Sequence, residues 1–258
     1  MSKTAFDLHY QPIVDLETGA IRSVEALLRW HHPAQGHVPP GTFVPIAERT
    51  GLIVKLGAWV LLEACRQGRV WQQACAGYEQ LGVAVNVSVQ QLEHPSLPKH
   101  VSQALEKSGL EPTCLTLEVT ESAVMRNDQT AQTALKHFKE LGIKLAIDDF
   151  GTGHSSFSRL GQLDIDVLKI DRSFVGTLSE GRSALEIVRA ISTAAASLGL
   201  GVVAEGVETE AQCAALRALP CDAGQGYLFA RPLPQNQVEA FLKLSEPWQW
   251  GKKVTSSE

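Results

Sequence analysis

Two adjacent carboxylates, Asp148 and Asp149, follow the apolar run that begins at Lys144 and precede a glycine-punctuated segment. Neighbouring side chains of a strand point to opposite faces, so both acids can approach one cation only where a strand ends and twists into a loop. An α/β barrel keeps its chemistry at strand ends of this kind. The same residue types would also suit a strand stop followed by a helix cap, because Asp, Gly, Thr and Ser favour turns and caps.

Other predicted strands also end in polar residues. The further members of this strand-end set are Glu25, Asn86, Glu118, Glu121, Lys169, Asp171, Glu205, Glu208 and Gln225. Taken singly, a strand-end glutamate is usually a solvated loop acid, Asn86 could satisfy a turn, and Lys169 could be a counterion of Asp171. These separate explanations would have to hold on six strands at once, so we prefer a shared function for the set.

The strand-end set is strongly acidic. Its eight acids would repel one another at one barrel mouth unless cations neutralised them. No His or Cys stands at these strand ends, so the set predicts oxygen ligands for Mg²⁺ or Mn²⁺ rather than a zinc site. Two divalent ions about 3.5–4 Å apart activate water and stabilise in-line attack at phosphorus. The chemistry that the set indicates is therefore phosphodiester hydrolysis.

The elements that must position these residues alternate between strands and helices. Apolar and β-branched runs predict strands over residues 8–14, 21–28, 83–87, 115–119, 144–148, 167–170, 202–204 and, more weakly, 226–229. Helical patterns cover residues 42–77, as two or three helices, and then 130–141, 184–198 and 210–219. Only residues 15–20 separate the first two strands. That connection is too short for a parallel crossover, so it predicts an antiparallel hairpin.

Eight strands in this alternation predict an α/β fold, a modified TIM (β/α)8 barrel with an antiparallel first strand. An open doubly wound sheet is the alternative, and it would lack the regular eightfold count. The 258 residues are 44% hydrophobic, and no linker or low-complexity tract divides them. A single domain over residues 1–258 is therefore expected.

Charge and composition exclude some classes of partner. The formal net charge is −5 and the pI about 5.9, which argues against a nucleic-acid polymer but allows a cation site that binds a small phosphate ligand. Apolar runs are interrupted well before the roughly 18 residues that suggest a membrane span, and no signal-like leader opens the chain. Five cysteines without a CxxC pair favour reduced thiols and a cytoplasmic setting.

The order and density of the motifs resemble the EAL domain family of bacterial cyclic-di-GMP phosphodiesterases. The resemblance covers about residues 8–242, the expected core of the domain. It rests on Tyr10-Gln-Pro-Ile, Glu25-Ala-Leu-Leu-Arg-Trp, Asn86-Val-Ser, Glu118-Val-Thr-Glu, Asp148-Asp-Phe-Gly-Thr-Gly, Lys169-Ile-Asp, Ala204-Glu-Gly-Val-Glu and Gln225-Gly-Tyr. It implies hydrolysis of cyclic-di-GMP to linear pGpG by a water activated by two Mg²⁺ or Mn²⁺ ions, with Ca²⁺ as an inhibitor.

The same resemblance implies a role for each residue. The implied metal ligands are Glu25, Asn86, Glu118, Asp148, Asp149 and Glu205, with Asp148 as the bridge between the ions. Lys169, supported by Glu205 and Glu25 as further catalytic residues, would orient or deprotonate the attacking water. Its pKa is expected to be lowered by the cations.

Substrate contacts and supporting residues are implied as well. Gln11, Arg29 and Asp171 would contact the substrate, with Arg29 as phosphate clamp because its planar fork suits phosphate oxygens. The supporting residues would be Glu208 and Gln225, beside Lys169 and the water network or at the second metal, and Glu121, which would hold the loop after Asp149.

Departures from the family pattern are mild. Phe157 stands where Leu is frequent, Arg231 where Lys is frequent, and His154 occupies a variable loop position; none of them removes an implied ligand. The resemblance also implies a homodimer formed beside the loop after Asp149. The chain would be either a stand-alone enzyme or part of a longer one with sensory or cyclase-like domains.

Two other functions are compatible with the pattern. A degenerate family member would bind cyclic-di-GMP as a receptor without cutting it, but such members generally lack parts of the metal set, which is complete here. An unrelated metal-dependent barrel hydrolase would act on another phosphoester. The enzyme acting on cyclic-di-GMP is therefore preferred.

Overall fold

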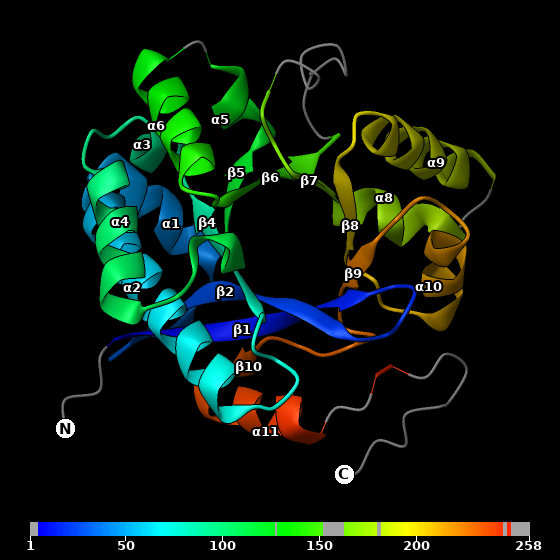
Figure 1. Ribbon diagram of the computed structural model, residues 1–258, viewed down its shortest axis with the longest axis horizontal. Coiled ribbons are helices and arrows are strands. Elements are labelled where there is room, and N and C mark those ends of the chain that lie inside the picture. The colour runs from blue at the N-terminus through cyan, green and yellow to red at the C-terminus, as the bar shows by residue number, and fades with distance from the viewer. Residues whose placement is uncertain (1–4, 127, 152–162, 180–181, 245–246, 249–258) are drawn as a thin grey trace.

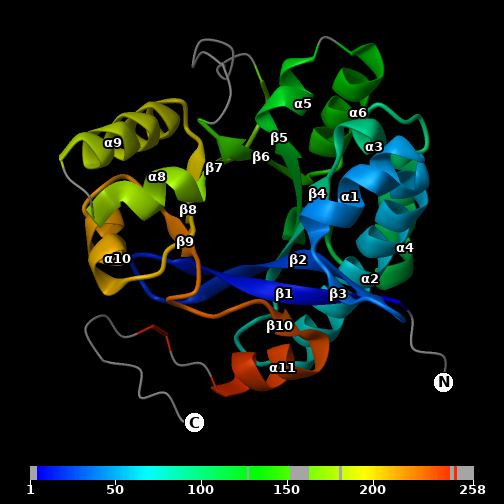
Figure 2. The same ribbon diagram turned by 180° about the vertical axis from the view of Figure 1, so that it is seen from behind.

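Across residues 5–126, 128–151, 163–179, 182–244 and 247–248, which the computed structural model describes, eight strands close into a barrel. They are β1 (Phe6–Asp15), β2 (Ile21–His32), β4 (Gly82–Val87), β5 (Leu115–Thr120), β6 (Lys144–Phe150), β7 (Val167–Ile170), β8 (Gly201–Glu205) and β9 (Ala223–Gln225). Two short strands, β3 (Gly36–Val38) and β10 (Leu233–Pro234), pair with β2 and β1 (Figures 1 and 2).

The first strand runs against both of its barrel neighbours. β1 is antiparallel to β2 and to β9, whereas each pair from β2 through β4, β5, β6, β7 and β8 to β9 is parallel. The β1–β2 pairing closes the sheet. The predicted hairpin and the predicted barrel are confirmed, and the open doubly wound sheet is excluded.

Helices lie around the outside of the strands in both views (Figures 1 and 2). They are α1 (Pro40–Arg49), α2 (Leu52–Ala74), α3 (Val89–Leu92), α4 (Leu97–Ser108), α5 (Glu121–Met125), α6 (Gln129–Glu140), α8 (Arg172–Gly176), α9 (Arg182–Ser197), α10 (Glu210–Arg217) and α11 (Gln235–Leu244), with 3₁₀ turns at Pro112–Cys114 and Thr177–Ser179. None of the described helices combines the length and apolar character needed to cross a membrane.

The predicted helical region 42–77 consists of two helices. Gly51 adopts a φ of 71° directly before α2. Side chains other than glycine rarely adopt this left-handed conformation, so the chain turns there instead of continuing the helix. The long α2 then packs against α4, which lies between the predicted strands 83–87 and 115–119.

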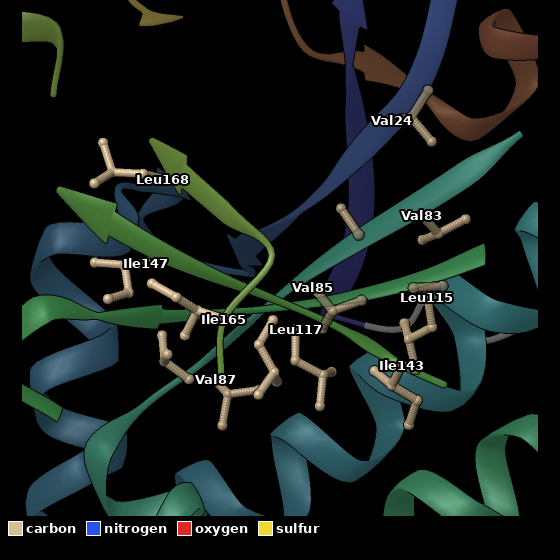
Figure 3. Packing of buried hydrophobic residues seen from close by; sticks show 14 of the residues in the cluster. Val24, Val83, Val85, Val87, Leu115, Leu117, Ile143, Ile147, Ile165 and Leu168 are labelled. Carbon is tan, nitrogen blue, oxygen red and sulfur yellow. The ribbon is translucent and has the colours of Figure 1, made fainter. Parts of the chain in front are cut away.

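Alternation along each strand separates an apolar outer face from a more polar inner one. Val83, Val85 and Val87 of β4 join the large core cluster between the strands and the helices (Figure 3). Ala84, between them, belongs instead to a small cluster with Ile13 and Ala223. The large cluster holds the strands in place, so their ends are free to carry polar side chains.

The weak strand predicted over residues 226–229 is wrong. The last barrel strand is β9, three residues earlier, and residues 226–229 form a turn in which Phe229 N–H donates to the Gly226 carbonyl over 3.1 Å. A Cβ at Gly226 would lie 2.0 Å from the Val207 carbonyl oxygen. This close approach requires glycine and ends the strand.

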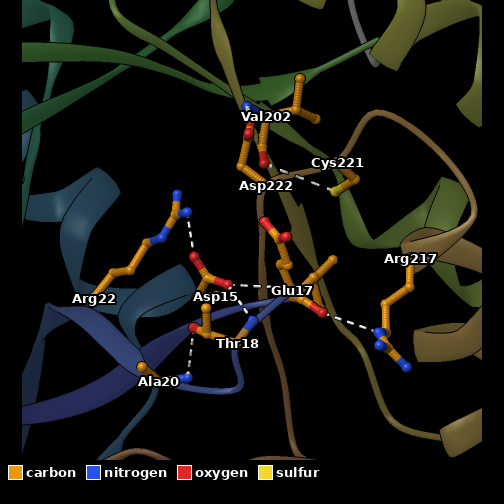
Figure 4. Close-up of polar contacts among 10 residues, drawn as sticks. Asp15, Glu17, Thr18, Ala20, Arg22, Val202, Arg217, Cys221 and Asp222 are labelled. Atoms are coloured by element: carbon orange, nitrogen blue, oxygen red, sulfur yellow. Dashed lines mark hydrogen bonds and ion pairs between the residues drawn. The ribbon is translucent and has the colours of Figure 1, made fainter.

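A buried carboxylate fixes the turn of the β1–β2 hairpin (Figure 4). Asp15 accepts hydrogen bonds from the backbone N–H groups of Glu17 (2.9 Å) and Thr18 (2.6 Å) and forms an ion pair with Arg22. Burial alone would raise the pKa of Asp15, but these hydrogen bonds and Arg22 lower it below its usual value. The folded state therefore favours the ionised form.

Asp15→Ala is expected to reduce the free energy of unfolding by about 1.5–3 kcal/mol near neutral pH, the usual contribution of hydrogen bonds to a charged group. Because the folded pKa is depressed, this contribution is present above the unfolded pKa of about 3.9 and is lost as the pH falls through the folded pKa. Urea unfolding across this range measures it. Glu17→Ala, at an exposed neighbour, is the control, and equal stabilities of both variants at pH 7 would contradict the prediction.

Candidate active site

The pairing register of neighbouring strands places the strand-end set at one end of the barrel. Gln11 lies opposite Glu25 across β1 and β2, Asn86 lies beside Glu118 across β4 and β5, and Glu205 lies beside Gln225 across β8 and β9. Adjacent strands thus present polar side chains at matching heights. Their convergence at the carboxyl ends of the parallel strands agrees with the sequence-based expectation.

Lys169 of β7 lies at the centre of the acidic residues. Its Nζ lies 2.5 Å from Glu205, 3.0 Å from Glu118, 3.1 Å from Asp148 and 3.8 Å from Glu25. The lysine side chain is only 1% exposed. A buried ammonium group in contact with four carboxylates is held in one orientation, which a group acting on a bound water requires.

The expected lowering of the Lys169 pKa supposed metal ions beside the lysine and stays a prediction, whereas the protein groups by themselves raise this pKa. Burial alone would lower this pKa, but Glu118, Glu25, Glu205 and Asp148 raise it well above its usual value. The sequence-based expectation considered cations as the nearest charges, whereas in the structure carboxylates are the nearest charges. Lys169 is therefore protonated whenever these carboxylates alone surround it.

One ammonium group does not balance the acids around it. Burial raises the pKa of Glu118 well above its usual value, and Lys169 offsets this only in part. Burial also raises the pKa of Glu205. The buried oxygens of Glu118 and Asp148 both face the single ammonium group of Lys169, at 3.0 and 3.1 Å. Four carboxylates around one ammonium group leave an excess of negative charge, which divalent cations would neutralise.

A bulge brings the two adjacent aspartates together. β6 continues to Phe150, past both acids, and its register with β7 shifts between Ile147 and Phe150. Asp149 adopts a φ of 54°, the one positive φ among the described non-glycine residues. Asp148 and Asp149 therefore need not alternate across the sheet, and the explanation is a bulge within the strand rather than its end.

Three carboxylates can already share one cation. Atoms of Asp148, Asp149 and Glu205 lie within 4.8 Å of one another, and among the described residues this is the one such group. Burial, then the charges of Asp148 and Asp171, raises the pKa of Asp149 to about 6. The donors are all oxygens, which suits Mg²⁺ or Mn²⁺.

Glu25 is held by two side-chain amides. Asn86 donates to one of its oxygens and Gln225 to the other, each over 2.6 Å. Gln225 also donates to Gln11, which donates in turn to the Ala230 carbonyl. Burial alone would raise the pKa of Glu25, but Lys169, Gln225 and Asn86 lower it, so Glu25 is ionised. Gln225 thus supports Glu25 directly and Lys169 only through it.

The remaining sequence-predicted residues lie around this centre. Asp171 caps α8, accepting from Ser173 N–H (3.0 Å) and Oγ (2.5 Å), and these bonds hold its pKa below the usual value although burial would raise it. Arg29 donates to the carbonyl of Leu28 and lines a neighbouring cavity of 420 Å³. Glu208 lines a cavity of 270 Å³ beside Glu205.

Glu121 contacts the start of the segment after the double aspartate. Its carboxylate accepts a hydrogen bond from Gly151 N–H over 3.2 Å. This contact agrees with the loop-holding role that the family resemblance implies. The rest of that segment, including His154 and Phe157, lies outside the described residues.

Arg172 and Tyr227 also line the 270 Å³ cavity, and the sequence interpretation did not single them out. Arg172 directly follows Asp171, and Tyr227 closes the motif that begins at Gln225, so both stood beside residues already selected. The guanidinium of Arg231 lies 4.2 Å from the Tyr227 ring centroid, in a cation–π contact. The cavity therefore contains the cation of Arg172 and the aromatic ring of Tyr227 in addition to its acids.

Fold and site together define a barrel protein of the modified TIM class with an oxygen-donor site at its mouth. The chain belongs to the EAL domain family, whose model matches residues 1–232.

Two relatives from Pseudomonas aeruginosa are similar to this chain. It is 47% identical to the cyclic di-GMP phosphodiesterase NbdA over 92% of this chain and 30% of that protein. It is also 47% identical to the bifunctional diguanylate cyclase/cyclic di-GMP phosphodiesterase MucR, over 90% of this chain and 34% of that protein. The chain thus spans about a third of the length of these relatives.

Solved structures agree in fold. The phosphodiesterase PaMucR in complex with c-di-GMP aligns with a TM-score of 0.85 and 46% identity, over 91% of this chain and 94% of that chain. The EAL enzyme Bd1971, bound to cAMP and cyclic-di-GMP, aligns with a TM-score of 0.89 and 33% identity, over 93% of this chain and 65% of that chain.

Proposed function

We propose that this chain hydrolyses one phosphodiester bond of cyclic-di-GMP to give linear pGpG, in a reaction that depends on two Mg²⁺ or Mn²⁺ ions and is inhibited by Ca²⁺. The observation that carries the proposal is the contact of one buried lysine, Lys169, with four carboxylates beside a group of three that can share a cation. Relatives named as cyclic di-GMP phosphodiesterases support the choice of substrate.

The residues that would hold the metal pair are Glu25, Asn86, Glu118, Asp148, Asp149 and Glu205. When bound, such a pair lowers the pKa of water and stabilises negative charge at phosphorus. Glu25 presents a fixed, ionised carboxylate because two amides hold its oxygens. Asn86 uses its amide nitrogen for Glu25, so its carbonyl oxygen is the atom suited to a metal.

Lys169 would position the attacking water and take part in moving its proton. Glu118, Asp148 and Glu205 contact its Nζ at 2.5–3.1 Å and fix its direction. In the ion-loaded protein these carboxylates share their charge with the metals, so they raise the Lys169 pKa less. Lys169 is then a better proton acceptor than it is among the carboxylates alone.

The substrate would lie across the two neighbouring cavities of 270 and 420 Å³, which share Leu27. The first is lined by Gln11, Tyr227 and the carboxylates Glu25, Asp148, Glu205 and Glu208. The second is mostly apolar and contains Arg29. An apolar wall suits a base, and an arginine suits a phosphate oxygen. Two adjoining cavities thus fit a ligand with two bases and two phosphates.

The wider setting also belongs to the proposal. We expect the chain to act in the cytoplasm, as a homodimer, on a small nucleotide rather than on a nucleic-acid polymer or a membrane. The length of the relatives supports sensory or cyclase-like domains in a longer parent protein.

Removal of divalent ions is expected to abolish turnover. Chromatography should show conversion of cyclic-di-GMP to pGpG with added Mg²⁺ or Mn²⁺, loss of product with excess chelator, and recovery when the metal is restored. Binding of cyclic-di-GMP without turnover would instead support the receptor function. Cleavage of an aryl phosphodiester but not of cyclic-di-GMP would support an unrelated barrel hydrolase.

A further inference from the structure

A cluster of histidines and one aspartate lies on the three-stranded ribbon β1–β2–β3, away from Lys169. Asp7 and His9 stand two residues apart on β1, and His31 on β2 pairs directly with His37 on β3. Asp7 lies opposite Arg29 in the register, two residues before His31 on the same face of β2. The three strands thus bring one carboxylate and three imidazoles to one face of the ribbon.

The carboxylate of Asp7 lies between two imidazoles. Its Oδ2 lies 3.6 Å from His9 Nε2 and its Oδ1 lies 3.5 Å from His31 Nε2. Both separations exceed ordinary hydrogen-bond lengths. Asp7 Oδ1 is also shielded from solvent and has no hydrogen-bond partner. This carboxylate oxygen therefore lacks the hydrogen bond that a shielded polar atom normally has, and the neighbouring protein groups do not supply it.

We propose that Asp7, His31 and His37, with His9 beside them, form a second metal site that binds a divalent cation of borderline softness such as Zn²⁺. Ligand atoms bound tetrahedrally at about 2.0 Å from a zinc ion are about 3.3 Å apart. The Asp7–His31 and Asp7–His9 separations are close to this value.

The third ligand is His37, whose side chain is exposed. His31 and His37 have ring centroids 5.7 Å apart, near the spacing of about 5 Å for two imidazoles on one ion. Among the described residues, only the group at Asp148 has three ligand atoms already within 4.8 Å. Binding here therefore requires the His37 ring to turn, and exposed side chains change rotamer within nanoseconds.

The donor set distinguishes this site from the acidic one. Imidazole nitrogens favour zinc, nickel and copper, whereas carboxylates alone favour Mg²⁺ and Mn²⁺. An imidazole binds a metal ion in its neutral form. Arg29 lies opposite Asp7 and opposes cation binding, so the neutral imidazoles supply the affinity. Mg²⁺ and Ca²⁺ are therefore not expected to occupy the site.

Calorimetric titration of the whole chain with Zn²⁺, in excess Mg²⁺, tests the site. One Zn²⁺ equivalent should be lost, or its Kd raised more than tenfold, in His31→Ala/His37→Ala and in Asp7→Asn, since even residues that only support a metal ligand contribute about 10- to 100-fold in affinity. The matched control is His94→Ala/His100→Ala, which removes two imidazoles near Ser96, elsewhere on the surface.

Equal zinc stoichiometry and affinity in the wild type and in the His31/His37 variant would overturn the inference. Circular dichroism is the check that the variants are folded. Both substituted histidines are exposed, so their replacement is expected to leave the fold intact. The inference does not depend on the proposed function, because cyclic-di-GMP turnover with Mg²⁺ and loss of the zinc equivalent are measured separately and either can fail alone.

Discussion

Lys169→Ala is expected to lower kcat for cyclic-di-GMP by about 10²–10⁴-fold, the contribution of a positioned acid–base group, while binding of the substrate changes little. Lys169 contacts the acids Glu118, Asp148 and Glu205 and is the strand-end cation at the barrel mouth. Its loss removes the group that orients the water but leaves the adjoining cavities intact. The rate of pGpG formation with saturating Mg²⁺ measures the effect, and calorimetry with Ca²⁺ in place of Mg²⁺ measures binding.

The design must separate catalysis from folding. Removing one partner of a buried charge cluster can cost about 3–5 kcal/mol, so melting curves are taken with excess Mg²⁺, whose charge replaces that of the lysine. Lys144→Ala is the matched control, because Lys144 is an exposed lysine at the start of β6, the end that lies away from Asp148 and Asp149. A Lys169→Ala protein that is folded and keeps its rate would refute the catalytic role.

The hairpin and the barrel can be predicted from local physics. A connection of residues 15–20 admits an antiparallel pair, and regular alternation of β-branched runs with helical patterns leaves few alternatives to a barrel. β9 cannot be found in this way, because Ala223-Gly224-Gln225 contains no β-branched or aromatic residue. Its strand conformation comes from pairing with β1 and β8, which is a tertiary effect.

The composition of the site was predictable, but its internal geometry was not. Polar residues at strand ends indicated which side chains converge. The sequence did not show that Asp149 adopts a left-handed conformation, so the bulge that brings it beside Asp148 was missed. It also gave no count of the carboxylates that contact Lys169. The direction of the lysine pKa among the protein groups alone depends on that count, and these carboxylates raise it.

Asp149→Asn is expected to abolish turnover and, in the presence of chelator, to stabilise the fold. Asp149 belongs to the group of three carboxylates that can share a cation, and loss of a ligand should exceed the 10- to 100-fold effect of removing a supporting residue. Asparagine keeps the shape of the side chain and tolerates the φ of 54°. The substitution therefore removes the charge without new backbone strain.

The pH dependence of the melting temperature distinguishes loss of the Asp149 charge from general disruption of the site. The pKa of Asp149 is raised to about 6 in the folded chain, first by burial and then by Asp148 and Asp171, against about 3.9 when unfolded. A raised carboxylate pKa destabilises the folded state progressively as the pH increases through this window. Asparagine does not ionise, so with chelator the melting temperature of the variant should match the wild type below pH 4 and exceed it above pH 6. With excess Mg²⁺ the order should reverse, because the ion stabilises the wild type more. A variant that is less stable than the wild type at pH 8 with chelator would show that Asp149 stabilises the fold instead of serving the metal site.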